Sequence, residues 1–188
     1  MRILVIGSGI GGITLAEKLR AISPKARITL LTRENYGYYS RPMLSHGFSK
    51  ADIENSIILK PFDKLLEKNI GVIGGVEVTR IDRNTQEITV SGIDGLETLS
   101  YDRLILALGS AAFIPPPFQP HKELFFSLNS LTDLLILRKF RQPFLDRNDP
   151  PHWGVIGGGL IGCEVASDLA VSGDRVTLYH AMDRLMER

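Results

Sequence analysis

The stretch RILVIGSGIGG, residues 2–12, decides how the chain begins to fold. Its apolar first half is typical of a short buried strand, and a run of glycines follows at once. Apolar residues then recur at helical spacing through residues 13–19, and residues 27–32 (RITLLT) predict a second strand. Strand, glycine-rich turn, helix and strand within about 30 residues indicate a parallel βαβ unit.

The glycines match the pattern GxGxxG of a dinucleotide-binding turn. In this pattern Gly7 permits a tight turn, Gly9 lets a pyrophosphate approach the backbone, and Gly12 allows close packing of helix on strand. The N-terminus of the helix then offers N–H groups to the phosphates. Glu34 follows about 20 residues later, at the end of the second strand, where a carboxylate accepts hydrogen bonds from ribose hydroxyls. We therefore predict a dinucleotide site rather than a purely structural turn.

The same pattern returns late in the chain. Gly157, Gly159 and Gly162 follow an apolar stretch at residues 153–156, and residues 175–179 (RVTLY) predict the next strand. Two complete fingerprints in one chain indicate two different dinucleotides.

The second unit has no acidic residue at its strand end. His180 stands there, with Arg184 close behind it. Either side chain can meet a 2′-phosphate, so the sequence leaves the choice between NADH and NADPH open. The simpler interpretation of His180 is a histidine that faces solvent.

The stretch between the two glycine motifs holds a loop and several further elements. Residues 34–50 are polar, aromatic and punctuated by Gly and Pro, which predicts a long ordered loop of the kind that serves a site. We then predict, in order, a helix at 61–69, a strand at 70–73, an antiparallel meander inserted into the parallel sheet at about 76–100, a central strand buried on both faces at 103–108, a stiff proline-rich linker at 115–120, and a helix at 130–141 capped by Ser130 and Asp133.

Composition excludes several function classes. The chain has 188 residues and a formal net charge of +1, so no basic excess attracts nucleic acid or a membrane surface. Its single cysteine, Cys163, excludes an intrachain disulfide, a Cys-only zinc site and a CxxC redox pair. The histidines are scattered, so we predict no metal site. No apolar run reaches the roughly 18 residues of a spanning helix, and we expect a cytoplasmic protein.

Four motifs carry a family resemblance: GSGIGG (7–12), YYSRPMLS (38–45), YDRLILALGS (101–110) and GGGLIGCE (157–164). In this order they resemble the amino-terminal part of the FAD-dependent pyridine nucleotide-disulfide oxidoreductases. The resemblance is greatest to the NAD(P)H-rubredoxin reductases and related ferredoxin reductases. It implies an α/β fold of two Rossmann-like βαβ units, with the first part of an FAD-binding domain at 1–115 and the start of an NAD(P)H-binding domain at 116–188. The architecture is incomplete, so we expect a truncated chain.

The resemblance also assigns site residues. For FAD it implies Gly7, Ser8, Gly9, Ile10, Gly11, Gly12, Arg33, Glu34, Arg41, Pro42, Val78, Ala107 and Gly109. For NAD(P)H it implies Gly157, Gly159, Leu160, Ile161 and Gly162. Arg41 resembles a cation that approaches the flavin ring, and Glu164 a carboxylate near flavin and nicotinamide, so these two are the predicted catalytic residues. For Glu164, a favourable acid in the first turn of a helix is the alternative.

The implied activity is transfer of electrons from NAD(P)H through FAD to a small iron–sulfur carrier such as rubredoxin or ferredoxin. The segment YYSRPMLS contains no cysteine pair, which excludes disulfide reduction, and Cys163 is better interpreted as a small packed residue. Tyr36, Tyr38 and Tyr39 either stack near the flavin or anchor their loop. Two alternatives remain open: a truncated, non-catalytic fragment, and one half of a split flavoprotein whose partner chain supplies the missing C-terminal half.

Overall fold

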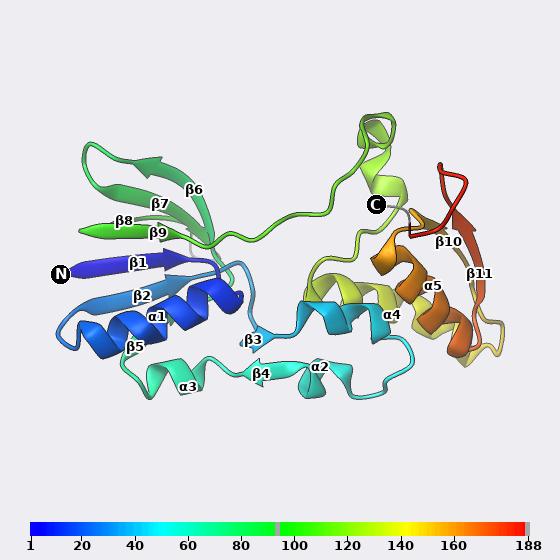
Figure 1. The fold of residues 1–188 in the computed structure, drawn as a ribbon, viewed down its shortest axis with the longest axis horizontal. Coiled ribbons are helices and arrows are strands. Elements are labelled where there is room, and N and C mark those ends of the chain that lie inside the picture. The colour runs from blue at the N-terminus through cyan, green and yellow to red at the C-terminus, as the bar shows by residue number, and fades with distance from the viewer. Residues whose placement is uncertain (93–94, 187–188) are drawn as a thin grey trace. The chain divides into compact units, whose positions relative to one another are not determined.

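A computed structural model of the chain describes residues 1–92 and 95–186 (Figure 1). The chain forms two compact units. The first comprises Met1–Tyr39 and Ile58–Ser110, and the second comprises Ser40–Ile57 and Ala111–Arg188. The segment 40–57 thus groups with the later part of the chain, although it interrupts the first unit in sequence. The functional domains predicted at 1–115 and 116–188 are a separate assignment, which this division does not test.

A four-stranded parallel sheet forms the centre of the first unit. Its strand order is β5-β2-β1-β9, and the helix α1 connects β1 to β2 as predicted (Figure 1). The elements are β1 (Arg2–Ile6), α1 (Ile10–Ile22), β2 (Arg27–Leu31), β5 (Ile70–Ile73) and β9 (Arg103–Leu106). The prediction of the first βαβ unit and of the strand at 70–73 is confirmed.

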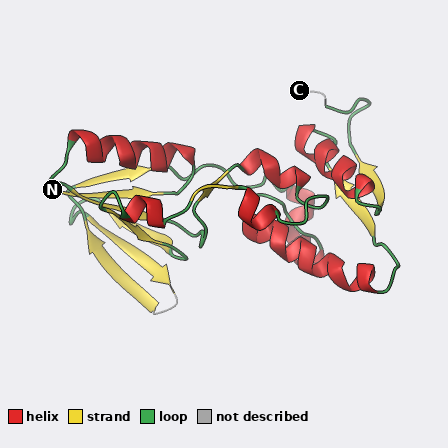
Figure 2. Cartoon of the chain, turned by 90° about the horizontal axis from the view of Figure 1, so that it is seen from below, coloured by secondary structure: helices red, strands yellow, loops and turns green. Residues whose placement is uncertain are grey.

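The two faces of this sheet pack against different partners. Ile3 and Val5 point to α1 and form one buried cluster with it, whereas Leu4 points to the opposite face and packs with Ile88 and Val90. Alternation along a strand sends successive side chains to opposite faces. The opposite layer is an antiparallel sheet of β6 (Glu77–Asp82), β7 (Glu87–Gly92) and β8 (Gly95–Ser100), which Figure 2 shows across the sheet from α1.

The meander was therefore predicted correctly as three antiparallel strands but wrongly as an insertion into the parallel sheet. It forms a sheet of its own. Local alternation specifies a strand and its turns, but it does not specify which sheet the strand joins. Within the meander the sequence Asp94-Gly95 predicts a turn, and Asp94 lies outside the described residues.

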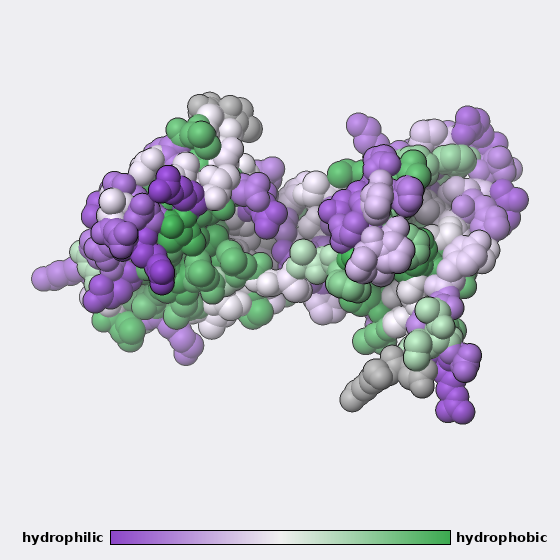
Figure 3. All heavy atoms as spheres, turned by 90° about the horizontal axis from the view of Figure 1, so that it is seen from above, coloured by the Kyte–Doolittle hydropathy of each residue, from purple (hydrophilic) through white to green (hydrophobic). Residues whose placement is uncertain are grey.

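The strand predicted at 103–108 was wrongly placed at the centre of the sheet. Within the described residues β9 pairs only with β1, and Leu106 is 55% exposed. An apolar run predicts a strand, but it does not show whether other strands pair with one of its edges or with both. Leu108 is exposed too, and Figure 3 shows further hydrophobic residues at the surface of the first unit.

Three segments contain more regular structure, or less, than predicted. The segment 34–50, predicted as a loop, contains a short strand and a 3₁₀ helix. The 3₁₀ helix forms where Pro42, at its start, has the backbone angle that a helical turn needs. The helix predicted at 61–69 is a single helical turn in the structure, and the linker predicted at 115–120 contains a 3₁₀ helix. The observed elements are β3 (Tyr38–Tyr39), η1 (Arg41–His46), α2 (Ile53–Ser56), β4 (Ile58–Lys60), α3 (Asp63–Leu66) and η2 (Pro116–Leu124).

The second unit contains the second βαβ motif. β10 (His152–Ile156) and β11 (Arg175–Tyr179) pair in parallel, and α5 (Leu160–Val171) connects them as predicted. α4 (Leu131–Asp146) precedes them. The predicted capping box at its start is confirmed, because Ser130 accepts from the N–H of Asp133 while the Asp133 carboxylate accepts from the N–H of Ser130. No helix of the described residues is long and apolar enough to cross a membrane.

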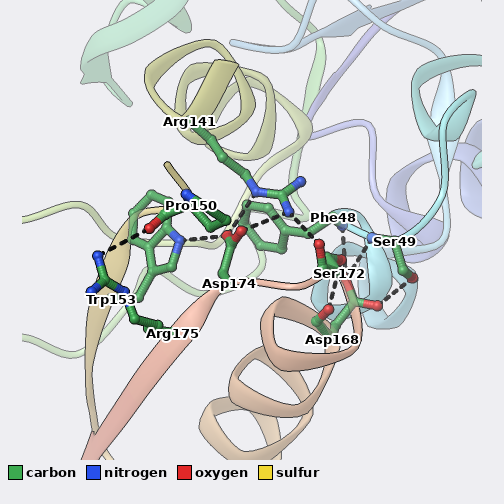
Figure 4. Close-up of polar contacts among 9 residues, drawn as sticks. All are labelled: Phe48, Ser49, Arg141, Pro150, Trp153, Asp168, Ser172, Asp174 and Arg175. Atoms are coloured by element: carbon green, nitrogen blue, oxygen red, sulfur yellow. Dashed lines mark hydrogen bonds and ion pairs between the residues drawn. The ribbon is translucent and has the colours of Figure 1, made fainter. Parts of the chain in front are cut away.

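A buried ion pair joins α4 to this βαβ motif (Figure 4). The Arg141 guanidinium donates two hydrogen bonds to the Asp174 carboxylate, at 2.7 and 2.8 Å, and a third to the backbone C=O of Ser172. The indole Nε1–H of Trp153 donates to the same carboxylate at 2.8 Å. The Asp174 side chain has no exposed surface, so each of its hydrogen bonds replaces one that water would make.

Removing this carboxylate is expected to destabilise the second unit strongly. Asp174→Ala leaves the Arg141 guanidinium buried without its counter-ion, which costs about 3–5 kcal/mol. Urea unfolding followed by the fluorescence of Trp153, the single tryptophan, measures the change. Asp149→Ala is the matched control, because Asp149 pairs with Arg175 at the surface and its loss should leave the midpoint unchanged. Equal midpoints for the two variants would contradict this account.

The stability of the first unit is expected to depend on pH through Glu17. Hydrogen bonds from Lys60 and then Lys68 to its carboxylate lower its pKa from the usual 4.5. A depressed folded-state pKa contributes stability that is present above the usual pKa and is lost as the pH falls through the folded value. The stability gap between wild type and Glu17→Gln should therefore exist at neutral pH and close in acid. Glu67→Gln, at an exposed pair with Lys64, should open no such gap.

Candidate functional site: two glycine turns

The first glycine turn is closed by backbone packing. Gly7 has φ +111° and its N–H donates to the C=O of Leu31 at 2.8 Å. A Cβ on Gly7 would lie 2.1 Å from the backbone oxygen of Ala107, and one on Gly12 would lie 1.9 Å from the oxygen of Gly7. A Cβ on Gly9 would meet nothing within 4 Å. Packing thus requires glycine at positions 7 and 12, whereas the backbone at Gly9 is open at the start of α1.

The second glycine turn repeats this geometry inside the second unit. Gly157 has φ +108° and its N–H donates to the C=O of Tyr179 at 2.9 Å. A Cβ on Gly162 would lie 1.8 Å from the oxygen of Gly157, whereas one on Gly159 would meet nothing within 4 Å. Both turns thus have a positive φ at the first glycine, open space at the second and close packing at the last. The binding of a pyrophosphate at the open glycines stays a prediction. Each turn leaves the N-terminus of a helix open to a phosphate.

Substitutions at neighbouring glycines of α1 should separate packing from exposure. Gly12→Ala forces a methyl group against the oxygen of Gly7 and is expected to lower the free energy of unfolding by about 1–3 kcal/mol or more. Gly11→Ala places the same methyl group in open space one residue earlier, where alanine favours the helix. Thermal unfolding of the two variants measures the difference. A Gly12→Ala protein as stable as Gly11→Ala would show that the turn is not closed as described.

Hydrogen bonds tie the predicted ribose-binding acid to the first turn. The Glu34 carboxylate accepts from the Tyr39 hydroxyl at 2.8 Å, and the Glu34 N–H donates to Oγ1 of Thr32 at 3.1 Å. Thr32 in turn shares a buried hydrogen bond of 2.8 Å with the hydroxyl of Ser8. Arg33 points elsewhere, to an exposed ion pair with Glu77 at 3.5 Å. Thr32 was not predicted as a site residue, since a threonine inside an apolar strand carries no distinctive signal.

The other residues predicted for FAD in this unit have defined backbone positions. The N–H of Ala107 donates to the C=O of Ile6 at 2.8 Å, and its oxygen approaches Gly7, so the end of β9 lies beside the first turn. Gly109 follows with φ +67°. Val78 lies on β6, opposite Val90, and its side chain packs on the core. The structure brings Ala107 to the turn; contact of these residues with a flavin stays a prediction.

The segment predicted to face the flavin belongs to the second unit. The Arg41 guanidinium donates to the backbone C=O of Asn129, and Pro42 is exposed. The Ser45 hydroxyl lies 2.7 Å from a carboxylate oxygen of Glu164 and 3.0 Å from the C=O of Pro42. The structure therefore brings Glu164 next to this segment. The alternative of an acid in the first helical turn is wrong, because α5 begins at Leu160 and has no acidic residue in its first turn; a site role for Glu164 stays a prediction.

Two further residues, which the sequence did not single out, hold the same segment. The Asp168 carboxylate, one turn after Glu164, accepts from the backbone N–H groups of Phe48 and Ser49 at 2.7 and 3.2 Å (Figure 4). The Arg138 guanidinium of α4 donates to the backbone oxygens of Gly47, Lys50 and Ala51 at 2.6–2.8 Å. The spacing of Asp168 from Glu164 along α5 and the charge of both residues were visible in the sequence, but their partners lie far away in the chain.

A pocket of about 340 Å³ opens on the second unit along α5. Glu164 and Leu160, both predicted site residues, line it, together with His46, Cys163, Ser167, Asp168, Val171 and Met186. Leu160 and Ile161 are exposed, so the first turn of α5 presents apolar surface near the glycine turn. The Cys163 thiol points to the C=O of Gly158 at 3.4 Å, in agreement with a small packed residue. Among the described residues, no group of three or more His, Cys, Asp or Glu side chains is arranged to hold a metal ion.

The interpretation of His180 as a solvent-facing residue was wrong. Its Nδ1 accepts from the N–H of Gly158 at 3.0 Å, and Nε2 lies 3.0 Å from the C=O of Arg184. The ring is half-buried and covers one side of the second glycine turn. Both ring nitrogens therefore have backbone partners, which the sequence could not show because they depend on how residues 180–186 fold back.

Comparison with known families identifies the fold. The whole chain, residues 1–188, matches the family described as pyridine nucleotide-disulphide oxidoreductase. The chain belongs to this family. The α/β fold and the family resemblance stated from the four motifs are confirmed.

Individual relatives agree with this assignment. The rubredoxin-NAD(+) reductase of Alcanivorax borkumensis is 32% identical over 98% of this chain and 46% of its own length. The ferredoxin–NAD(+) reductase subunit of a benzene 1,2-dioxygenase system from Pseudomonas putida is 34% identical over 99% of this chain and 43% of its own. The crystal structure of NADH:rubredoxin oxidoreductase from Clostridium acetobutylicum superposes with TM-score 0.74 and 31% identity, over 94% of this chain and 43% of that one. The chain thus spans about half the length of the relatives it matches.

Proposed function

We propose that the chain is the nucleotide-binding part of an FAD-dependent NAD(P)H oxidoreductase that passes electrons to a small iron–sulfur carrier of the rubredoxin or ferredoxin type. The observation that carries the proposal is the pair of glycine turns with the same backbone geometry, one in each unit. Two such turns provide for two dinucleotides. The names of the relatives, rubredoxin and ferredoxin reductases, supply the class of acceptor.

The residues of the first turn fit the adenosine and pyrophosphate of FAD. Gly9 leaves room for phosphate against the backbone, and Glu34 presents a carboxylate to the ribose hydroxyls at the end of β2. Val78, Ala107 and Gly109 would line the rest of the FAD site. When bound, FAD supplies the redox chemistry, since a flavin accepts two electrons together and releases them singly.

The second turn would hold the pyrophosphate of NAD(P)H. The backbone at Gly159 is open to a ligand, because a Cβ there would meet nothing within 4 Å. Leu160 and Ile161 have exposed apolar side chains in the first turn of α5. In this proposal Glu164 places a negative charge beside the nicotinamide, and Arg41 places a positive charge near the flavin, where it stabilises the ring as it gains electrons. Both charges are held by hydrogen bonds to neighbouring groups of the second unit.

We infer that the protein acts in the cytoplasm.

The visible absorbance spectrum of the purified, desalted chain tests this proposal. FAD at about one molecule per chain, identified after release by denaturation, is the expected result. Gly9→Ala is the informative variant, because a methyl group in the open part of the turn should lower FAD content while leaving the fold intact. Anaerobic bleaching of the flavin by NADH and by NADPH, compared at equal concentration, then identifies the electron donor.

The opposite outcome favours the other candidate. The chain covers less than half of its relatives' length, and apolar residues such as Leu106 and Ile156 are exposed. A colourless protein that added FAD cannot reconstitute would contradict the proposal and indicate a non-catalytic fragment or one half of a split flavoprotein. Recovery of FAD binding on addition of a chain carrying the C-terminal half would then identify the split form.

A further inference from the structure

Tyr39 is a buried tyrosine whose hydroxyl meets an acid. Its side chain is 4% exposed, and its phenolic O–H donates to Oε1 of Glu34 at 2.8 Å. A hydrogen bond to a carboxylate is stronger than one between neutral groups, and it fixes the direction of the carboxylate as well as its position. β3 pairs with β4 through an irregular register between Tyr38 and Tyr39, which gives the two tyrosines different surroundings.

The backbone of Glu34 is held independently of Tyr39. Its N–H donates to Oγ1 of Thr32, and its C=O accepts from the N–H of Gly75 at 3.3 Å. Thr32 is itself buried and bonded to Ser8 in the glycine turn. The main chain of Glu34 is thus fixed relative to the turn, and the torsions of its side chain are what the Tyr39 hydrogen bond restricts.

We propose that Tyr39 is a positioning residue for nucleotide recognition: it holds the Glu34 carboxylate in the orientation that accepts the ribose hydroxyls of the adenosine half of FAD. The inference rests on the proposed FAD site. An acid held in one direction loses less conformational entropy when the ribose binds than one that rotates freely. Tyr39 therefore contributes to affinity without touching the ligand.

The chain offers a matched control in the preceding residue. Tyr38 lies on the same short strand and packs against the apolar cluster behind α1, and its hydroxyl makes no hydrogen bond to the described residues. Tyr38→Phe and Tyr39→Phe remove the same oxygen from adjacent residues of the same strand. Only the second removes a hydrogen bond to Glu34.

The test uses ADP, which carries the adenosine of FAD and both phosphates of its pyrophosphate. ADP is titrated into the isotope-labelled full chain, and its binding is measured from the NMR chemical shifts of the backbone amides of Ser8 to Gly12. Binding at the second glycine turn is then measured separately. Tyr39→Phe is expected to weaken ADP binding at the first turn about 5- to 10-fold. Tyr38→Phe should bind ADP as wild type does. With 2′,3′-dideoxy-ADP, which lacks the ribose hydroxyls, the loss in Tyr39→Phe should disappear.

A double-mutant cycle shows whether Tyr39 acts through Glu34. In a Glu34→Ala background, which has no side-chain acceptor for the Tyr39 hydroxyl, Tyr39→Phe should add no further loss. Equal ADP affinity of Tyr39→Phe and wild type would overturn the inference, as would an equal loss with the dideoxy ligand or a fully additive double variant. Failure of wild type to bind ADP at the first turn is a different result, because it would overturn the proposed FAD site itself and the role of Tyr39 with it.

Discussion

The contact between the first and last glycines of each turn determines the rest of the architecture. In both units the helix begins so close to the preceding strand that a single methyl group on Gly12 or Gly162 would collide with a backbone oxygen. Close approach directs the helix N-terminus to the carboxyl end of the strand and leaves N–H groups open there. The same constraint therefore provides helix–sheet packing and a place for phosphate. It occurs twice, and the proposal of two dinucleotides depends on both occurrences.

The side chains predicted for the site are held by different hydrogen bonds in the two units. In the first unit a line of hydrogen bonds runs from Ser8 through Thr32 to Glu34 and Tyr39. In the second unit carboxylates one helical turn apart, Glu164 and Asp168, bond to the 41–49 segment. Buried polar groups of this kind are costly unless satisfied, so these hydrogen bonds strongly favour one arrangement of the segments that carry the predicted site residues.

Sequence patterns predicted what is local and failed where partners are distant. The glycine spacing predicted both βαβ units, and Ser130 with Asp133 predicted the start of α4, because these depend on neighbouring residues. The position of β9 at a sheet edge, the separate sheet of the meander and the short strand at Tyr38–Tyr39 depend on pairing with distant segments. His180 was misjudged for the same reason. Asp168 and Arg138 were overlooked because their partners lie far away in the chain.

The central claim is that the two turns bind different dinucleotides, and hydrogen–deuterium exchange of the full chain with each ligand tests it most directly. FAD is expected to slow exchange in residues 7–12 and around Glu34, and to leave residues 157–162 unchanged. NADH or NADPH should do the reverse. Protection of the same turn by both ligands, or of neither turn by either, would contradict the account.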